Sequence, residues 1–159
     1  MTDLKISPEI SWTETDRALP MPLDLSDKTM ALAIQSSDFI NALDQEPLKV
    51  TGLSAGRYAL KIDGEKVGDF TGQQLAEGIN LATLPTPMAK QAARVHDLTV
   101  KHDDVHFARW RDLQVTLQDY TFPSEATAVT ALDKLENDVV QEQRTSAEPK
   151  TRHYELAPE

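Results

Sequence analysis

The sequence predicts an α+β protein in which a small antiparallel β-sheet, or meander, packs with long carboxy-terminal helices. Strand-like segments come first, within residues 4–16 and 48–70, where short apolar stretches are separated by turn residues. Helical periodicity follows in residues 72–77, 87–118 and 121–143. The 159 residues are enough for one compact domain of roughly 100–150 residues with extensions.

The first strand segment, residues 4–16, alternates apolar and polar side chains, with Trp12 on the apolar face. This pattern predicts a half-buried strand interrupted at Pro8, as at a sheet edge or bulge. Residues 24–44 leave two structures open. The Ser-Asp pair at 26–27 can cap a short helix, but the apolar residues that follow fit a strand equally well.

The clearest strands lie in the middle of the chain, at residues 48–53, 57–63 and 66–70. A Ser-Ala-Gly loop at 54–56 separates the first two, and Asp63-Gly64 supplies the turn before the third. We therefore expect a three-stranded antiparallel meander.

A short helix at residues 72–77 is predicted by a capping box, with Thr71 as the N-cap and Gln74 three residues later. Gly78 stands where a helix of this length would end, because glycine adopts positive φ without steric cost.

The long helix over residues 87–118 begins at Thr86-Pro87, since proline is favoured at the first helical position, and Asp103-Asp104 marks a kink or break. We expect residues 1–120 to form the α+β domain and residues 121–143 to add one more helix. The last segment, residues 144–159, is polar and contains prolines, which predicts an irregular or disordered tail.

Composition narrows the classes of function. The net charge of −10 opposes nucleic-acid binding, because phosphate backbones are bound by clustered Lys and Arg. No apolar run is long enough to insert into a membrane, and the first residues lack the features of a signal peptide. These features do not indicate a cellular compartment. The absence of cysteine excludes disulfides and cysteine nucleophiles.

Three stretches carry a resemblance to a known family: SWTETDRALPMP near the start, the block from Leu48 to Val115, and YELAP near the end. Together they resemble the carboxy-terminal region of bacterial SGNH (GDSL-type) hydrolases, which follows the catalytic domain in those proteins. The resemblance implies an ester hydrolase as the parent enzyme, and such parents are exported in some cases. It also implies that the present chain docks to an SGNH catalytic domain or, without one, self-associates.

The catalytic blocks of that family are missing. No serine lies in a G-D-S or G-x-S-x-G pattern, so we expect no catalytic residue and no cofactor. Asp103 and His106 match the family's D-x-x-H pair literally, but an acid and a base without a nucleophile make no hydrolase. The expected function is a non-catalytic accessory domain, truncated or split from its enzyme. The alternative is a stand-alone binding or protein-interaction module.

Two further sets of residues are candidate sites. His96, His102 and His106 fall at roughly helical spacing and give a lesser alternative, a small metal-binding protein. We expect instead that these imidazoles have structural roles and that no metal is bound.

Arg109, Trp110 and Arg111 suggest either an interaction site or ordinary packing. Trp110 would anchor a docked domain in the first case. In the favoured second case, Trp110 is buried in the core and the arginines pair with nearby acids. Glu14 and Asp16 are interpreted as a solvated strand face, and Asp63 and Asn80 as turn and cap residues.

Overall fold

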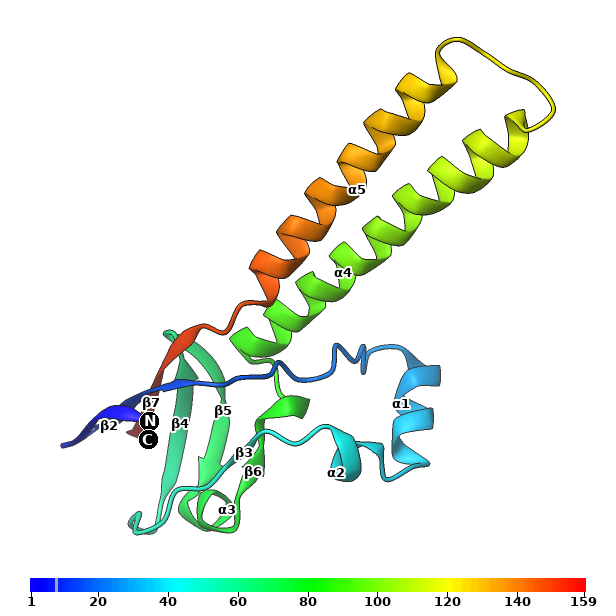
Figure 1. Ribbon diagram of the computed structural model, residues 1–159. Helices are drawn as coiled ribbons and strands as arrows, with labels where there is room; N and C mark the ends of the chain where they lie inside the picture. Colours follow the sequence, from blue (N-terminus) through cyan, green and yellow to red (C-terminus); the bar gives the residue numbers. More distant parts are fainter. Residues whose placement is uncertain (8) are drawn as a thin grey trace. The chain divides into compact units, whose positions relative to one another are not determined.

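The computed structural model describes residues 1–7 and 9–159, which divide into two compact units. The first unit comprises residues 1–92 and 149–159 and contains a five-stranded sheet. The second comprises residues 93–148 and is a helical hairpin (Figure 1). The chain combines an antiparallel sheet with helices, so the α+β prediction is confirmed.

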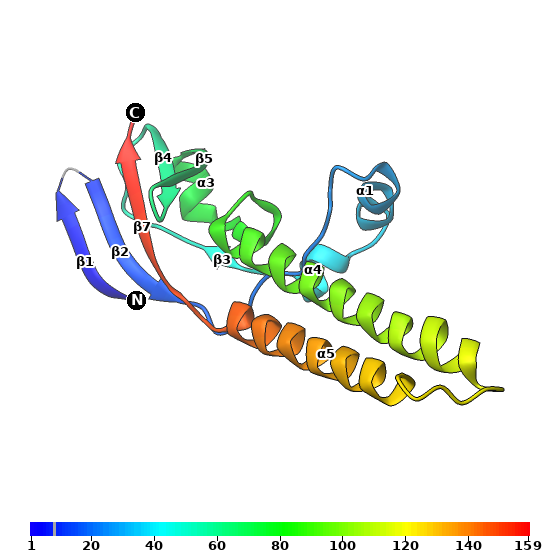
Figure 2. The ribbon, with the colours of Figure 1, turned by 90° about the horizontal axis from the view of Figure 1, so that it is seen from above.

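All neighbouring strands of the sheet are antiparallel, and the carboxy-terminal strand lies at its centre (Figure 2). In spatial order the strands are β1 (Thr2–Ser7), β2 (Glu9–Thr15), β7 (Thr151–Pro158), β4 (Arg57–Ile62) and β5 (Glu65–Thr71). The prediction of a disordered tail over residues 144–159 is therefore wrong.

The central position of β7 follows from its pairing and packing. Tyr154 lies opposite Trp12 of β2, and Leu156 lies opposite Leu60 of β4. Tyr154 and Leu156 are buried, and the Tyr154 ring stacks on Trp12 with 5.0 Å between centroids. The alternation is short and flanked by polar residues, so its strand character depends on partners that are remote in sequence.

The strand predictions need two more corrections. Residues 4–16 form the hairpin of β1 and β2 rather than one strand, and the predicted interruption at Pro8 lies outside the described residues. The segment 48–53 does not join a meander. Instead, β3 (Pro47–Leu48) pairs with β6 (Ile79–Asn80) in a separate two-stranded sheet. A short apolar run after a proline fits a loop as well as a strand, so the pattern alone could not place it.

Local signals placed the other elements of the first unit. The predicted turn joins β4 to β5, with positive φ at both Asp63 and Gly64. The capping box on α3 (Gly72–Glu77) is present, and Gly78 ends that helix at positive φ.

Residues 24–44, for which the sequence allowed either a helix or a strand, contain two helices. Asp27 caps α1 (Lys28–Gln35) by accepting hydrogen bonds from two backbone amides, and α2 (Phe39–Leu43) follows. A short 3₁₀ turn, η1 (Leu81–Thr83), then leads towards the long helices.

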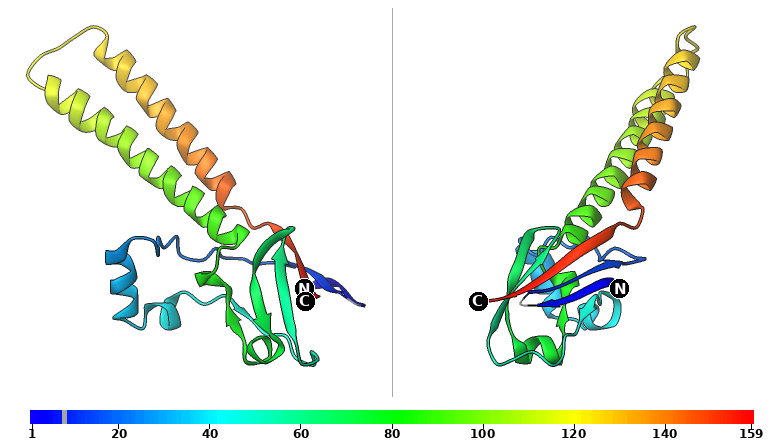
Figure 3. Two further views of the ribbon diagram at one scale, coloured as in Figure 1. Left: turned by 180° about the vertical axis from the view of Figure 1, so that it is seen from behind. Right: turned by 90° about the vertical axis from the view of Figure 1, so that its left-hand side faces the viewer.

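The second unit is built from two long helices that run side by side in opposite directions (Figures 2 and 3). Helix α4 (Pro87–Phe107) starts at the predicted proline and passes through Asp103 and Asp104 without a break. Its winding widens instead in the π-helical segment η2 (Ala108–Val115). Helix α5 (Glu125–Ala147) extends beyond the predicted end at residue 143. No helix within residues 1–7 and 9–159 is long and apolar enough to cross a membrane.

Because β7 is a central strand, Leu156→Ala is expected to lower the free energy of unfolding by about 2–5 kcal/mol, the cost of truncating a fully buried leucine. Urea denaturation measures this difference. Leu32→Ala on the exposed surface of α1 is the control and should change stability by no more than about 0.5 kcal/mol. Equal effects of the two substitutions would contradict a central β7.

Candidate functional site

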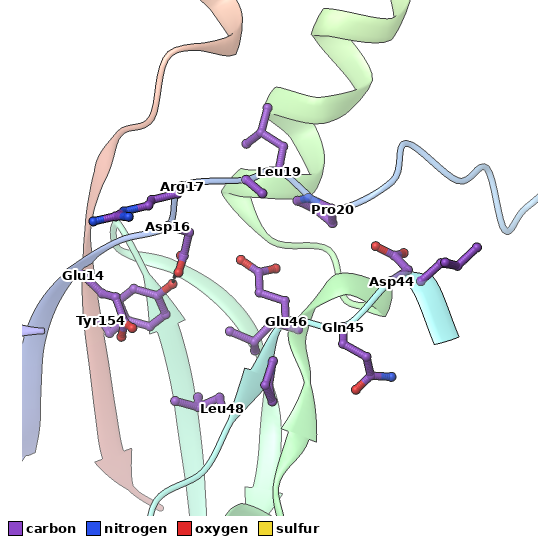
Figure 4. A pocket seen from close by; sticks show the side chains of 14 residues that line it. Glu14, Asp16, Arg17, Leu19, Pro20, Asp44, Gln45, Glu46, Leu48 and Tyr154 are labelled. Carbon is purple, nitrogen blue, oxygen red and sulfur yellow. Dashed lines mark hydrogen bonds between the residues drawn. The ribbon is translucent and has the colours of Figure 1, made fainter. Parts of the chain in front are cut away.

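A cavity of about 390 Å³ lies within the first unit (Figure 4). Its walls come from the end of β2 and the segment that follows it, from the segment between α2 and β3, and from Tyr154 on β7. The volume lies in the range of small-molecule pockets, about 300–1,000 Å³. The walls include four carboxylates, those of Glu14, Asp16, Asp44 and Glu46.

The Asn80 side chain holds the segment between α2 and β3 in place. Its Oδ1 accepts hydrogen bonds from the backbone amides of Glu46 at 2.8 Å and Ala82 at 3.1 Å. Its Nδ2 donates to the backbone carbonyl of Asp44 at 2.9 Å. One amide thus satisfies backbone groups on both sides of residue 45, and this fixes the two acidic side chains against the cavity. The predicted capping role of Asn80 is confirmed, with a second role in positioning.

Asp44 is almost fully buried, with 3% of its surface exposed. Its Oδ1 accepts a hydrogen bond from the Met21 backbone amide at 2.9 Å. Its Oδ2 has no hydrogen-bond partner among the described residues. A buried carboxylate oxygen without a partner is costly, and this residue belongs to the lining of the cavity.

Glu46 is half-buried, and neither of its carboxylate oxygens has a hydrogen-bond partner in the described part of the chain. Figure 4 shows its side chain projecting into the space between Asp16 and Asp44. Burial, followed by the negative charges of Asp16, Asp44 and Glu14, raises the pKa of Glu46 from 4.5 to about 7. This carboxyl group therefore changes charge near neutral pH.

Two aromatic side chains hold the other two carboxylates. The Tyr154 hydroxyl donates to Asp16 Oδ2 at 3.3 Å, and the Trp12 indole N–H donates to Glu14 Oε2 at 3.2 Å. Burial raises the pKa of Tyr154, and the charges of Asp16, Glu46 and Glu14 raise it further. The phenol accordingly stays protonated and acts as a hydrogen-bond donor at the cavity wall.

The arrangement combines a titrating carboxyl group with a neutral phenol in a partly enclosed space. A carboxyl group with a pKa near 7 can donate or accept a proton at neutral pH, which is the property of a general acid or base. The described residues contain no group of three or more His, Asp or Glu side chains that could hold a metal ion. The raised pKa of Glu46 makes proton transfer one chemistry that the cavity walls can support.

The histidines and arginines singled out in the sequence all belong to the second unit, and none of them is among the residues that line this cavity. His106 Nδ1 is 3.0 Å from Glu136 Oε1, and the rings of His102 and His106 are 6.4 Å apart. Asp103 is near His102, at 3.6 Å, and is exposed on α4 with His106. The structure thus assigns the D-x-x-H spacing to consecutive turns of one helix.

Arg109 pairs with acids on α5, as predicted, with its Nε 3.1 Å from Asp133 and 3.2 Å from Glu136. Trp110 is not in a core, because half of its surface is exposed, and its ring meets Phe107 edge-on at 6.5 Å between ring centroids. Arg111 is exposed as well. A pair of helices buries only one narrow stripe of each helix, so helical periodicity overestimated the burial of Trp110.

Sequence patterns did not predict the cavity residues as a site. Glu14 and Asp16 were expected to form a solvated face, yet both are half-buried on the cavity wall. Asp44 and Glu46 lie beside a proline in a short segment with no diagnostic spacing. Tyr154 was placed in the supposed tail. The sequence signal for this site was the density of acidic residues next to apolar strands. Such a density is also typical of ordinary solvated surfaces, so it does not identify a site.

The comparisons with known proteins add one structural likeness. No protein-family model matches the chain, and no curated protein does. Among solved structures, the chain is similar to BT4096, described as a gut microbial diltiazem-metabolizing enzyme, with a TM-score of 0.78 and 24% sequence identity. The match covers 99% of this chain and 45% of that protein. At this level of identity the likeness establishes a shared fold.

This likeness corrects the expected family. The comparisons give no support to a carboxy-terminal region of an SGNH hydrolase, and almost the whole chain instead matches part of BT4096. The expected function of a non-catalytic SGNH accessory domain is contradicted by the same finding.

The raised pKa of Glu46 predicts how stability depends on pH. The folded chain binds this proton more tightly than the unfolded chain, so the stabilising contribution is complete below pH 4.5 and is lost as the pH rises towards about 7. Relative to the parent chain, Glu46→Gln should therefore become more stable across this window, by roughly 1–3 kcal/mol once partial screening by solvent is allowed for.

Urea denaturation from acidic to neutral pH measures this difference. Glu77→Gln, on the exposed face of α3, controls for the loss of a surface carboxylate. A stability difference for Glu46→Gln that stays constant across the window would show that the carboxyl group titrates normally.

Self-association stays a prediction, and the exposed aromatic side chains of the second unit allow it to be tested. These side chains are Phe107, Trp110, Tyr120 and Phe122. Exposed apolar clusters favour contact with another surface, so Trp110→Ser should reduce the fraction of dimer in sedimentation velocity. Met30→Ser, an exposed position of the first unit, should leave it unchanged. A parent chain that sediments as a monomer at all concentrations would exclude self-association.

Proposed function

We propose that this chain is part of an enzyme that metabolises a small organic molecule, and that Glu46 transfers a proton to or from that molecule in the cavity of the first unit. The observation that carries the proposal is the state of Glu46. Its carboxyl group is half-buried, has no hydrogen-bond partner among the described residues, and has a pKa raised to about 7. Folding leaves such groups in place at a cost, and they concentrate at active sites.

The shared fold supports the same conclusion. BT4096 is described as a diltiazem-metabolizing enzyme, and its fold includes a region that matches 99% of this chain. The present chain spans 45% of the length of that protein, so the activity of the whole protein is part of the proposal. A cavity of about 390 Å³ is large enough to hold a substantial part of a small organic molecule.

The neighbouring groups have supporting roles. At neutral pH the protonated and ionised forms of Glu46 are both populated, so the group can act as acid or base without a large free-energy cost. The Tyr154 hydroxyl, now bonded to Asp16 at 3.3 Å, can rotate to donate to a polar atom of the substrate. Asn80 positions Glu46 by accepting a hydrogen bond from the Glu46 backbone amide.

The proposal is tested by incubating the chain with diltiazem and following loss of the compound by chromatography and mass spectrometry. Glu46→Gln keeps the size of the side chain but cannot exchange a proton, and should lower the rate by about 10²–10⁴-fold. The parent rate should change with pH through a group that titrates near pH 7.

Glu77→Gln is the matched control, because Glu77 is an exposed glutamate of the same unit, and it should retain the parental rate. Two results would count against the proposal. One is full activity of Glu46→Gln. The other is a parent chain that consumes no diltiazem above the rate in buffer.

A further inference from the structure

The cavity of the first unit has an unbalanced charge. Glu14, Asp16, Asp44 and Glu46 contribute four carboxyl groups, and Arg17 is the one basic residue on the walls. Figure 4 shows the Arg17 side chain directed away from Glu46, and the residue is exposed. Within the part of the chain that the structure describes, no Lys or Arg forms an ion pair with any of the four carboxyl groups. The cavity therefore presents negative potential without an internal counter-charge.

Asp44 gives a second and independent indication of a ligand. The residue is 97% buried, because only 3% of its surface is exposed, and its Oδ1 is occupied by the Met21 amide. Its Oδ2 is left without a partner among the described residues, and Asp44 is one of the residues that line the cavity. A buried, unpaired carboxylate oxygen is unfavourable unless a positively charged or hydrogen-bonding group meets it. The structure thus contains a fixed acceptor that the protein itself does not satisfy.

The distribution of the carboxyl groups argues against a metal ion. The described residues include no set of three or more acidic or imidazole side chains that could hold one, whereas divalent cations need several oxygen ligands at about 2.0–2.6 Å. The four groups instead surround a space of about 390 Å³. This spacing fits an organic cation, whose charge is spread over a larger volume.

The remaining walls suit the apolar part of such a cation. Leu19, Pro20, Leu48 and Leu81 line the cavity together with the Tyr154 side chain. Ammonium groups bind favourably at sites that combine carboxylates with aromatic rings, while their alkyl substituents contact apolar side chains. Charge and apolar surface are therefore present on one set of walls.

We propose that this cavity binds a small organic ammonium ion, with Asp44 Oδ2 and the carboxylates of Glu46 and Asp16 surrounding the positively charged nitrogen. The inference rests on the proposed function only in taking the cavity as the substrate site, and it assigns the class of substrate as a protonated amine. Asp44 is the fixed acceptor, because its other oxygen and its backbone carbonyl are held by Met21 and Asn80.

The test compares two probes of nearly equal shape, N,N-dimethylethanolammonium and the neutral 3-methyl-1-butanol. The full chain, labelled with ¹⁵N, is titrated with each probe, and backbone amide shifts at Met21 and Glu46 report binding. The ammonium ion should bind at least about tenfold more tightly than the alcohol, as expected for a partly desolvated charge pair. Equal affinities would overturn the proposal.

Substitutions then locate the charge. Asp44→Asn keeps an oxygen for the Met21 amide and removes the negative charge, and should weaken ammonium binding about tenfold or more. Asp16→Asn is the second variant, in case Asp44→Asn does not fold. Asp138→Asn, at an exposed position of α5 in the other unit, should bind as the parent does. Parental affinity in a folded Asp44→Asn or Asp16→Asn variant would overturn the assignment.

Mg²⁺ and Ca²⁺ are titrated alone and in competition. Displacement of the ammonium ion by either metal at equal concentration would show that the carboxylates form a metal site and would overturn the proposal. The two proposals can fail separately, because ammonium binding is measured without turnover of a substrate. A chain that binds the ammonium ion but retains full activity as Glu46→Gln would keep this inference and lose the catalytic role.

Discussion

The first unit depends on the insertion of β7 between β2 and β4. This strand forms backbone hydrogen bonds on both sides, so the sheet would divide into two hairpins without it. Tyr154 stacks on Trp12 on one side, and Leu156 lies opposite Leu60 on the other. The segments that meet here are separated by most of the chain, so their pairing costs loop-closure entropy that burial of these side chains must offset.

The same insertion creates the cavity wall. Tyr154 points towards Asp16, whose segment follows β2, while the Asn80 side chain holds Asp44 and Glu46 on the facing segment. Glu46 is consequently kept among three other acids and away from full solvation, which raises the pKa of its carboxyl group. The sheet and the hydrogen bonds of Asn80 thus fix the position of the Glu46 carboxyl group before any ligand is bound.

The second unit shows how far spacing alone can mislead. Asp103 and His106, and the histidine pair four residues apart, have the intervals of catalytic or metal-binding motifs. In the structure they lie on an exposed helix, with His106 beside Glu136 of the neighbouring helix. Residues at such intervals share a helix face for geometric reasons. A motif therefore indicates a site only where the fold also supplies an enclosed space and convergent partners.

Short-range signals were sufficient for the α+β class, for the capping box at Thr71, for the Asp63-Gly64 turn and for the helix start at Pro87, because each depends on neighbours within a few residues. Such signals could not predict that Thr151–Pro158 form a central strand, nor which residues line the cavity. β7 is a strand because β2 and β4 bury its apolar residues, and Glu46 is unusual because remote acids surround it. Both properties arise from contacts between distant segments, which leave no local pattern in the chain.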